Sequence, residues 1–174
     1  MMRNRKSCRR GVAVIELLRV DDRLIHGQVA VSWTAYLGVD TILVANDSAA
    51  HNDLMKTAFK MAKPPQVVLS IKSVDGAILV INNPKYKDRH MFVVCASPAD
   101  AARIAERTAA VRKVCLGGVR QSGNRKRISA QVFLDSADIE ALNRLEALGA
   151  EVILQSVPDQ NPMKLEEIKR IFRS

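Results

Sequence analysis

Short apolar runs rich in β-branched residues alternate along the chain with longer segments whose apolar positions recur at helical spacing. This alternation is typical of a parallel sheet that helices cover on both faces. The strands that it predicts span residues 12–20, 41–45, 66–71, 91–96, 113–116, 130–134 and 151–156. The pattern therefore predicts an α/β fold of a single domain, an open and mostly parallel seven-stranded sheet with helices on both faces.

Helical spacing between these runs predicts which side chains face the core. The predicted buried faces are Val29, Trp33, Tyr36 and Leu37; Leu54, Ala58, Met61 and Ala62; Val74, Ala77, Ile78 and Ile81; and Ile139, Leu142, Leu145 and Leu148. Ser97 and Pro98 predict a helix that begins at Ala99, and Ser136 predicts a cap before the fourth face. A turn over residues 159–162 precedes a last short helix.

The basic residues are unevenly distributed. The chain of 174 residues has 27 Lys and Arg, of which Arg3, Arg5, Lys6, Arg9 and Arg10 lie within the first ten positions. From residue 11 onwards the chain has the other 22 basic residues and 18 Asp and Glu, which gives a net charge of only +4. We predict that residues 1–13 are a basic, disordered leader and that residues 14–174 form the domain. This small surplus, with aromatics at 4%, is a poor basis for nucleic-acid binding.

The three cysteines, Cys8, Cys95 and Cys115, are widely spaced and form no CxxC pair. Their spacing predicts neither a disulfide framework nor a zinc site, and we expect no metal and no cofactor. Cys95 and Cys115 fall within strand patterns, which indicates buried thiols. No apolar run approaches the ~20 residues that a membrane span requires. The sequence predicts a cytoplasmic protein without a direct membrane span.

Ionisable side chains crowd the segment that follows the first predicted strand. They are Asp21, Asp22, Arg23 and His26, directly before Gly27 and the first helical pattern. A helix N-terminus offers unpaired N–H groups and a partial positive charge, so an anion held beside His26 would be stabilised there. Arg23 could bind a phosphate with its planar fork. Asp21 or Asp22 could fix which imidazole nitrogen stays free to attack.

A simpler interpretation is open for each of these residues. A loop histidine is most often solvated or held by a structural hydrogen bond, and an Asp–Arg pair is usually a surface ion pair. The position after the first strand favours chemistry at His26, because ligands of α/β sheets collect beyond the carboxyl ends of the strands. His51 and His90 have no such neighbours, and we interpret both as structural.

Residues 19–29 read Arg-Val-Asp-Asp-Arg-Leu-Ile-His-Gly-Gln-Val, and Trp33 follows in the first helical pattern. This run resembles the active-site motif of IIB components of the mannose/sorbose family of the bacterial phosphoenolpyruvate-dependent sugar phosphotransferase system. Further landmarks in the family's order are Val44-Ala45-Asn46-Asp47, Lys63-Pro64-Pro65, Asn82-Asn83-Pro84, Val114-Cys115-Leu116-Gly117-Gly118 and Val157-Pro158. The resemblance covers about residues 14–172, nearly the whole domain.

The resemblance implies a phosphocarrier. Family members take a phosphoryl group from a phosphohistidine of a IIA partner onto Nδ1 of the histidine that matches His26. They pass it to a sugar during uptake through the membrane components IIC and IID, with which a IIB protein associates peripherally. Asp21 and Arg23 match positions that orient this histidine and bind the phosphoryl group, and we expect Gly27 and Gln28 to bind phosphate. The implied activity is that of a protein-phosphohistidine–sugar phosphotransferase component of EC 2.7.1 type, with no cofactor.

The segment after Gly118 departs from the family pattern, because Asn124 and Arg125 stand where relatives usually have Gly and then Lys or Arg. It is either a flexible solvated loop or a basic rim, formed by Arg120, Arg125 and Lys126, that receives the partner.

Two rival functions stay open at this point. One is a regulatory phosphocarrier without a cognate transporter. The other is a phosphate-ester-binding enzyme that uses His26 as nucleophile or base.

Overall fold

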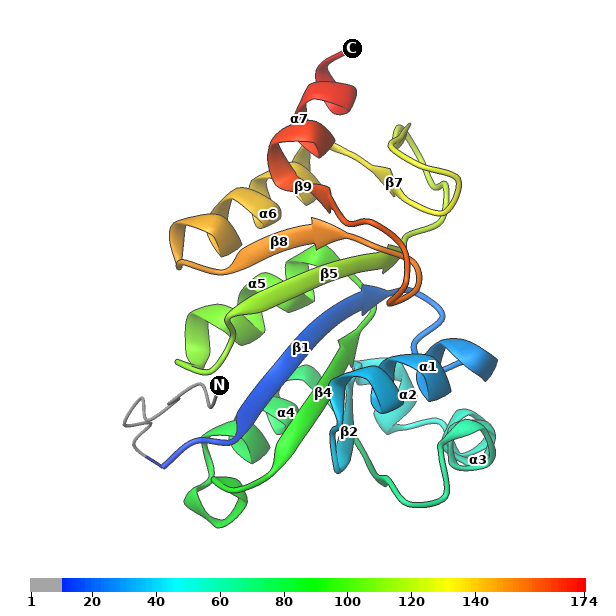
Figure 1. Cartoon of the computed structure of the whole chain (residues 1–174), viewed down its shortest axis with the longest axis vertical. Coiled ribbons are helices and arrows are strands. Elements are labelled where there is room, and N and C mark those ends of the chain that lie inside the picture. The colour runs from blue at the N-terminus through cyan, green and yellow to red at the C-terminus, as the bar shows by residue number, and fades with distance from the viewer. Residues whose placement is uncertain (1–10) are drawn as a thin grey trace.

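The main sheet is mostly parallel, as the sequence predicts. The computed structural model describes residues 11–174, and Figure 1 shows the strands as one twisted layer. They are β1 (Val14–Asp21), β2 (Thr41–Ala45), β3 (Val68–Lys72), β4 (His90–Cys95), β5 (Lys113–Gly118), β8 (Glu151–Leu154) and β9 (Met163–Lys164). Their order is β3-β2-β4-β1-β5-β8-β9, and only β8 and β9 pair antiparallel within the described sheet. The predicted α/β architecture is confirmed.

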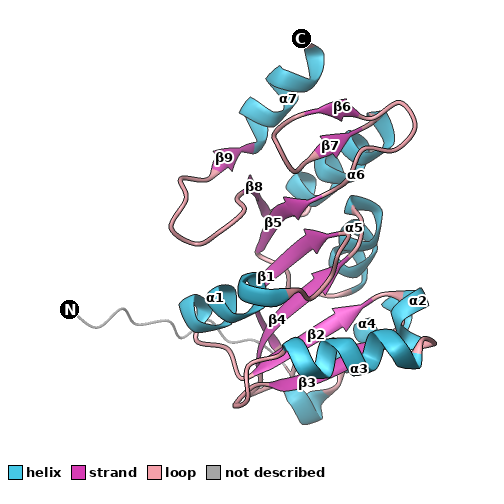
Figure 2. Cartoon of the chain, turned by 90° about the vertical axis from the view of Figure 1, so that its right-hand side faces the viewer, coloured by secondary structure: helices cyan, strands magenta, loops and turns pink. Residues whose placement is uncertain are grey.

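Helices lie on both sides of this sheet (Figure 2). One core forms against α1 (Gly27–Leu37), α2 (Asp47–Ala50) and α3 (Asp53–Ala62). The other forms against α4 (Val74–Asn82), α5 (Pro98–Arg107), α6 (Ser136–Ala147) and α7 (Leu165–Arg173). Successive residues of β1 divide between them, with Leu17 in the core of Trp33 and Leu18 in the core of Ile104. The strands read as continuous apolar runs because both faces are covered.

The predicted strand over residues 130–134 does not join the main sheet. Its last two residues form β7 (Phe133–Leu134), which pairs antiparallel with β6 (Lys126–Arg127) as a separate small sheet. The seventh strand of the main sheet is instead β9, after the segment where we predicted only a turn. Val132 and Leu134 are buried. The apolar pattern therefore indicated burial but carried no information on the pairing partner.

Three of the four predicted helix faces need correction. The face predicted for α4 is fully buried, whereas Leu54 and Met61 of α3 are 80% and 83% exposed. The side of α3 that packs inward carries Phe59 instead. Its aromatic ring buries more apolar area against the sheet than Leu54 or Met61 would. Tyr36 and Leu148 are also exposed, although the spacing placed both on buried faces.

The helix boundaries follow local capping chemistry. Ser97 caps α5 by accepting a hydrogen bond from the backbone N–H of Asp100, and Pro98 is the first residue of the helix. At α6 the cap is Asp135 rather than Ser136, because Asp135 and Asp138 exchange hydrogen bonds in a capping box. A short 3-10 helix (Pro84–Tyr86) precedes β4.

The fold extends one residue before β1. Ala13 is fully buried, and its N–H donates to the carbonyl of Ile81 at 3.0 Å. Residues 1–10 of the predicted leader lie outside the described residues. Within residues 11–174, no helix is both long and apolar enough to cross a membrane.

Both cysteines within the described residues lie in the sheet, Cys95 at the end of β4 and Cys115 inside β5. Burial raises the pKa of the Cys95 thiol. Burial also raises the pKa of the Cys115 thiol to about 11, an effect that the nearby Arg19 guanidinium partly offsets.

We expect neither buried thiol to react in the folded protein, because the thiolate is the nucleophile and burial disfavours it. In a Cys8→Ser variant, a chromogenic disulfide reagent at pH 8 should label no cysteine in buffer and both remaining cysteines after unfolding in urea. Rapid labelling of either one before unfolding would contradict the burial described above.

Candidate functional site

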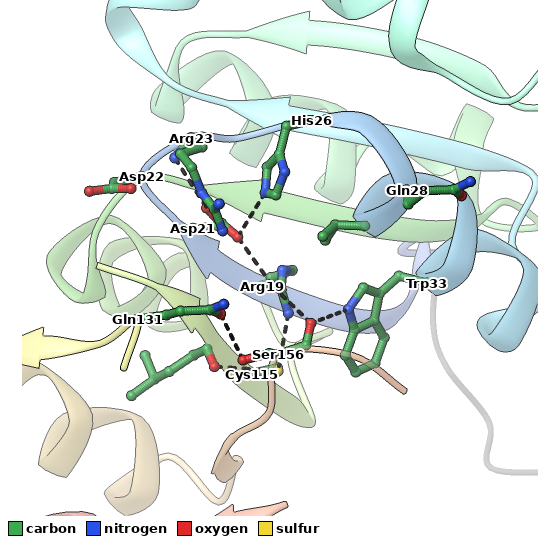
Figure 3. A network of polar contacts seen from close by, with 12 residues as sticks. Arg19, Asp21, Asp22, Arg23, His26, Gln28, Trp33, Cys115, Gln131 and Ser156 are labelled. Carbon is green, nitrogen blue, oxygen red and sulfur yellow. Dashed lines mark hydrogen bonds and ion pairs between the residues drawn. The ribbon is translucent and has the colours of Figure 1, made fainter. Parts of the chain in front are cut away.

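The residues singled out from the sequence meet at the carboxyl end of β1, in the centre of the sheet between β4 and β5. Ligands of open α/β sheets bind at this edge. The loop of residues 22–26 joins β1 to α1 there, and Figure 3 shows Arg23 and His26 of this loop beside Asp21 at the strand end.

The loop is shaped by a tight turn and two buried side chains. The N–H of Leu24 donates to the carbonyl of Asp21 at 2.9 Å, and Leu24 has a φ of 58°. This left-handed conformation costs roughly 1–2 kcal/mol for a residue with a Cβ. Burial of Leu24 and Ile25 in the core beside Trp33 offsets that cost. The turn leaves His26 in extended conformation as the residue that precedes α1.

A chain of contacts runs from the core through Asp21 to His26. The carboxylate of Asp21 is fully buried. Its Oδ2 accepts a hydrogen bond from Nη2 of Arg19 at 3.1 Å and lies 3.3 Å from Nε2 of His26. Its Oδ1 accepts from the backbone N–H and from Nε of Arg23, at 3.1 and 3.3 Å. Figure 3 shows Asp21 between the two arginines and the imidazole.

This arrangement fixes the tautomer of His26. An ionised carboxylate only accepts hydrogen bonds, so the imidazole nitrogen that faces Asp21 carries the proton. Nε2 of His26 is that nitrogen, so in the neutral imidazole Nδ1 is the nitrogen that keeps the lone pair. The His26 side chain is 28% exposed. The geometry therefore assigns Nδ1 as the nucleophilic nitrogen of the neutral ring, whose orientation the core determines.

The sequence did not single out Arg19 as a site residue. This arginine is 1% exposed, and its Nη1 and Nη2 donate to the carbonyls of Gln155 and Ser156 at 3.1 and 3.2 Å. Its guanidinium lies 5.4 Å from the centre of the Trp33 ring, whose Nε1 donates to the same Ser156 carbonyl. The signal available in the sequence was an arginine within the apolar stretch from Leu17 to Val20, since a cation is rarely buried unless it is paired.

The space for Arg19 depends on Gly117. A Cβ added at Gly117 would lie 1.9 Å from Cζ of Arg19, far inside contact distance. The next residue, Gly118, is also close to the site, since a Cβ there would lie 3.0 Å from Oδ1 of Asp21. The double glycine therefore has a steric role beneath the charged residues, which the sequence did not reveal.

The N-terminus of α1 has no side-chain cap, in contrast to α2, α3, α4, α5 and α6. Its first residue, Gly27, has a φ of 38°, and Gln28 is exposed. The first N–H groups of a helix have no partner within the helix. They can therefore bind an anion beside His26, where we expect Gly27 and Gln28 to act.

The structure separates the remaining charged residues from the imidazole. The Asp22 carboxylate points away from His26 in Figure 3, and its Oδ2 accepts hydrogen bonds from the backbone N–H and Nε of Arg120, both at 2.9 Å. Nε of Arg125 donates to Asp138 at 2.9 Å, and Nζ of Lys126 donates to the carbonyl of Phe172 at 3.0 Å. Of the three residues expected to form a basic rim, Arg120 alone is bound to the His26 loop.

The two other histidines make local contacts. Nδ1 of His51 lies 3.1 Å from the carbonyl of Asp47, and Nδ1 of His90 lies 2.7 Å from Oε1 of Glu16. Neither contacts the loop of residues 22–26, consistent with the structural interpretation. Among residues 11–174, no group of three or more His, Cys, Asp or Glu side chains could hold a metal ion.

Comparison with known proteins gives one consistent family. A family model described as the sorbose subfamily IIB component of the PTS system matches residues 15–173. The chain is 34% identical over 155 residues to the PTS system mannose-specific EIIAB component of Escherichia coli (strain K12), which covers 89% of this chain and 48% of that protein. It is 34% identical over 160 residues to the PTS system sorbose-specific EIIB component of Lacticaseibacillus casei, covering 91% and 98%. The chain thus spans about half the length of the mannose-specific relative.

Solved structures agree with these matches. The IIBSor domain of the sorbose permease from Klebsiella pneumoniae superposes with a TM-score of 0.86 at 29% identity, covering 90% of this chain and 97% of that one. The structure of manxB from Thermoanaerobacter tengcongensis superposes with a TM-score of 0.86 at 27% identity, covering 92% and 97%.

We expect Gly117→Ala to destabilise the protein by roughly 1–3 kcal/mol or more, because the new Cβ overlaps the buried Arg19 guanidinium. Urea unfolding followed by circular dichroism measures the loss. Gly123→Ala is the control, since a Cβ there meets nothing within 4 Å and its φ of 55° limits the cost to roughly 1–2 kcal/mol. Gly117 has no positive φ, so backbone strain contributes nothing to its loss; a loss below roughly 1 kcal/mol for Gly117→Ala would show that Arg19 does not require a glycine there.

Proposed function

Because the chain belongs to the sorbose subfamily of IIB components of the phosphotransferase system, we propose that it is a phosphocarrier in sugar uptake, with His26 as the residue that carries the phosphoryl group. One observation supports this assignment above the others. Nδ1 of His26 is left with a free lone pair beside an uncapped helix N-terminus, while Nε2 is held by the buried Asp21.

The first transfer moves a phosphoryl group between two histidines. The Nδ1 lone pair of His26 attacks the phosphorus of a phosphohistidine on a IIA partner, so a nitrogen–phosphorus bond forms on His26 as the donor's bond breaks. Asp21 stabilises the positive charge that the ring gains, because its carboxylate accepts a hydrogen bond from Nε2–H and does not itself become protonated. Charge on the three transferred oxygens would be met by the N–H groups of Gly27 and Gln28 and by the Arg23 guanidinium.

The second transfer passes the group to a sugar. A sugar hydroxyl attacks the phosphorus, its proton leaves to solvent, and the bond to Nδ1 breaks. Both transfers have loose transition states, for which positioning and positive electrostatics provide most of the catalysis. A fixed imidazole at the edge of the sheet meets this requirement. The activity is that of a protein-phosphohistidine–sugar phosphotransferase component.

The proposed partners are a phosphorylated IIA protein or domain on the donor side and membrane IIC and IID components with their sugar on the acceptor side. Relatives are named as mannose-specific and sorbose-specific, which supports a small sugar as the final acceptor. We place the protein in the cytoplasm, associated peripherally with such a transporter. Arg120 is the member of the predicted rim that remains beside the site, and exposed charge there would speed encounter with an acidic donor face.

We expect His26→Ala to abolish phosphorylation. The purified chain, incubated with labelled phosphoenolpyruvate, the two general phosphotransferase proteins and a competent IIA component, should acquire an acid-labile, alkali-stable label. His51→Ala is the matched control and should be labelled like the wild type, since His51 makes only a local backbone contact. Label on His26→Ala would move the carrier role to another residue. No label on the wild type with a competent donor would remove the proposed function.

We expect Asp21→Asn to slow phosphorylation by at least about 10- to 100-fold, the loss typical when the partner that orients a metal-binding histidine is removed. Asparagine can face Nε2 with its amide N–H₂, which no longer requires a proton on Nε2. The ¹⁵N shifts of the His26 ring report the tautomer directly, and the amide spectrum checks that the variant is folded. An unchanged rate together with an unchanged tautomer would contradict the role of Asp21.

A further inference from the structure

A cavity lies beside the His26 loop, between that loop and the segment that joins β5 to β7. Its volume is about 270 Å³, close to the lower end of the ~300–1,000 Å³ typical of small-molecule sites. Its lining includes Asp22, Arg23, Arg120, Ala130, Gln131 and Phe133. His26 is not part of the lining. The cavity therefore lies next to the proposed phosphoryl-binding position at His26 and shares Arg23 with it, but it does not include the imidazole.

Two arginines in the lining are held in the same way. The backbone N–H and Nε of Arg23 donate hydrogen bonds to Asp21, and the same two groups of Arg120 donate to Asp22. No described residue accepts a hydrogen bond from the terminal nitrogens of either guanidinium. The two side chains are 44% and 76% exposed, so these nitrogens remain accessible. The free terminal nitrogens of the two guanidinium groups could therefore donate hydrogen bonds to a phosphate group.

The lining also contains groups that a bare anion would not use. Oδ1 of Asp22 is shielded from solvent and has no hydrogen-bond partner among the described residues. Buried polar atoms normally have a hydrogen-bond partner, so this oxygen is an acceptor that the described residues leave unsatisfied beside the cavity. Oε1 of Gln131 is held by the Ser156 hydroxyl at 2.8 Å. The fixed amide can donate through Nε2 to a ligand oxygen.

Apolar side chains complete the lining. Ala130 and Phe133 form part of the wall, and Gly118 leaves the floor without a side chain. Small-molecule sites typically combine an apolar wall with a few polar groups that fix orientation. A ring with one carbon face and several hydroxyls matches such a wall. An anion surrounded by water does not.

We propose that this cavity binds a sugar phosphate, with the phosphate between Arg23 and Arg120 and the sugar ring against Ala130 and Phe133. The choice of a sugar ester rests on the proposed function, in which a phosphorylated sugar is the product. Since Arg23 lines the cavity and contacts Asp21, a bound ester engages the same guanidinium that would meet the phosphoryl group on His26.

The test is a titration of the ¹⁵N-labelled full chain with mannose 6-phosphate, mannose and inorganic phosphate at matched ionic strength, followed by amide shifts. Mannose 6-phosphate should shift the amides of residues 118–121 and 130–133 and bind at least about tenfold more tightly than phosphate, as hydrogen bonds to the hydroxyls predict. Mannose alone should shift none of them. Arg120→Gln, which removes one fork, and Ala130→Leu, which fills the cavity, should each weaken binding about tenfold or more.

Arg112→Gln is the matched control, because it removes the same charge at the other end of β5, where the side chain is exposed. It should leave binding within about twofold, as expected for screened surface charge. Three results would overturn the inference: equal affinity for inorganic phosphate, shifts confined to residues 26–29, or equal weakening by Arg112→Gln and Arg120→Gln.

The phosphorylation assay keeps this inference separate from the proposed function. A wild-type chain that is phosphorylated but binds no mannose 6-phosphate overturns the cavity assignment alone. A chain that binds the ester as described but is never phosphorylated by a competent donor overturns the carrier role. In His26→Ala, which cannot carry the group on that histidine, the ester should still bind because His26 lies outside the lining.

Discussion

The buried ion pair between Arg19 and Asp21 is the interaction on which the rest of the site depends. Both side chains are buried, and removal of one partner of such a pair costs about 3–5 kcal/mol, because the other charge is left uncompensated. Arg19 also binds the carbonyls after β8 and the ring of Trp33 in α1. One guanidinium therefore ties the segment after β8 and helix α1 to the strand end, and Asp21 transmits this rigidity to His26. The imidazole is oriented by the core, although it sits in a loop.

The part of this arrangement that could be predicted from the sequence is the local part. The strand β1, the loop with His26 and the N-terminus of α1 are contiguous, so spacing and residue type indicate them. The partners of Arg19 are not contiguous, since the carbonyls of Gln155 and Ser156 lie 136 and 137 residues away. Every residue has a backbone carbonyl, so the sequence does not indicate which carbonyls will bind a buried arginine. Gly117 shows the same limit, because its requirement for no Cβ becomes visible only when Arg19 is in place.

The basic segment after Gly118 illustrates a second limit, which concerns charge. In the sequence Arg120, Arg125 and Lys126 look like one patch, but the structure gives each a different partner: Asp22, Asp138 and the carbonyl of Phe172. An acidic pair at the start of α6 binds Arg125 because Asp135 and Asp138 already face each other in a capping box. A run of like charges therefore predicts a charged surface only where no acidic residue from elsewhere in the fold meets it.

The charge balance of the site suits a group that must be passed on. Around the strand end, Arg19, Arg23 and Arg120 face Asp21 and Asp22, so the cluster has one surplus positive charge. The α1 N-terminus adds roughly 0.3–1 kcal/mol of attraction for an anion, up to ~2 kcal/mol when partly buried. Without the two carboxylates, three guanidinium groups would hold a phosphoryl dianion far more strongly. If the phosphorylated state were bound very tightly, the protein would accept the phosphoryl group readily but release it slowly. Only stabilisation of the transition state relative to both the free and the phosphorylated protein speeds the two transfers together. The aspartates thus matter to a carrier for two reasons: they fix the geometry, and they keep the phosphorylated state from becoming too stable.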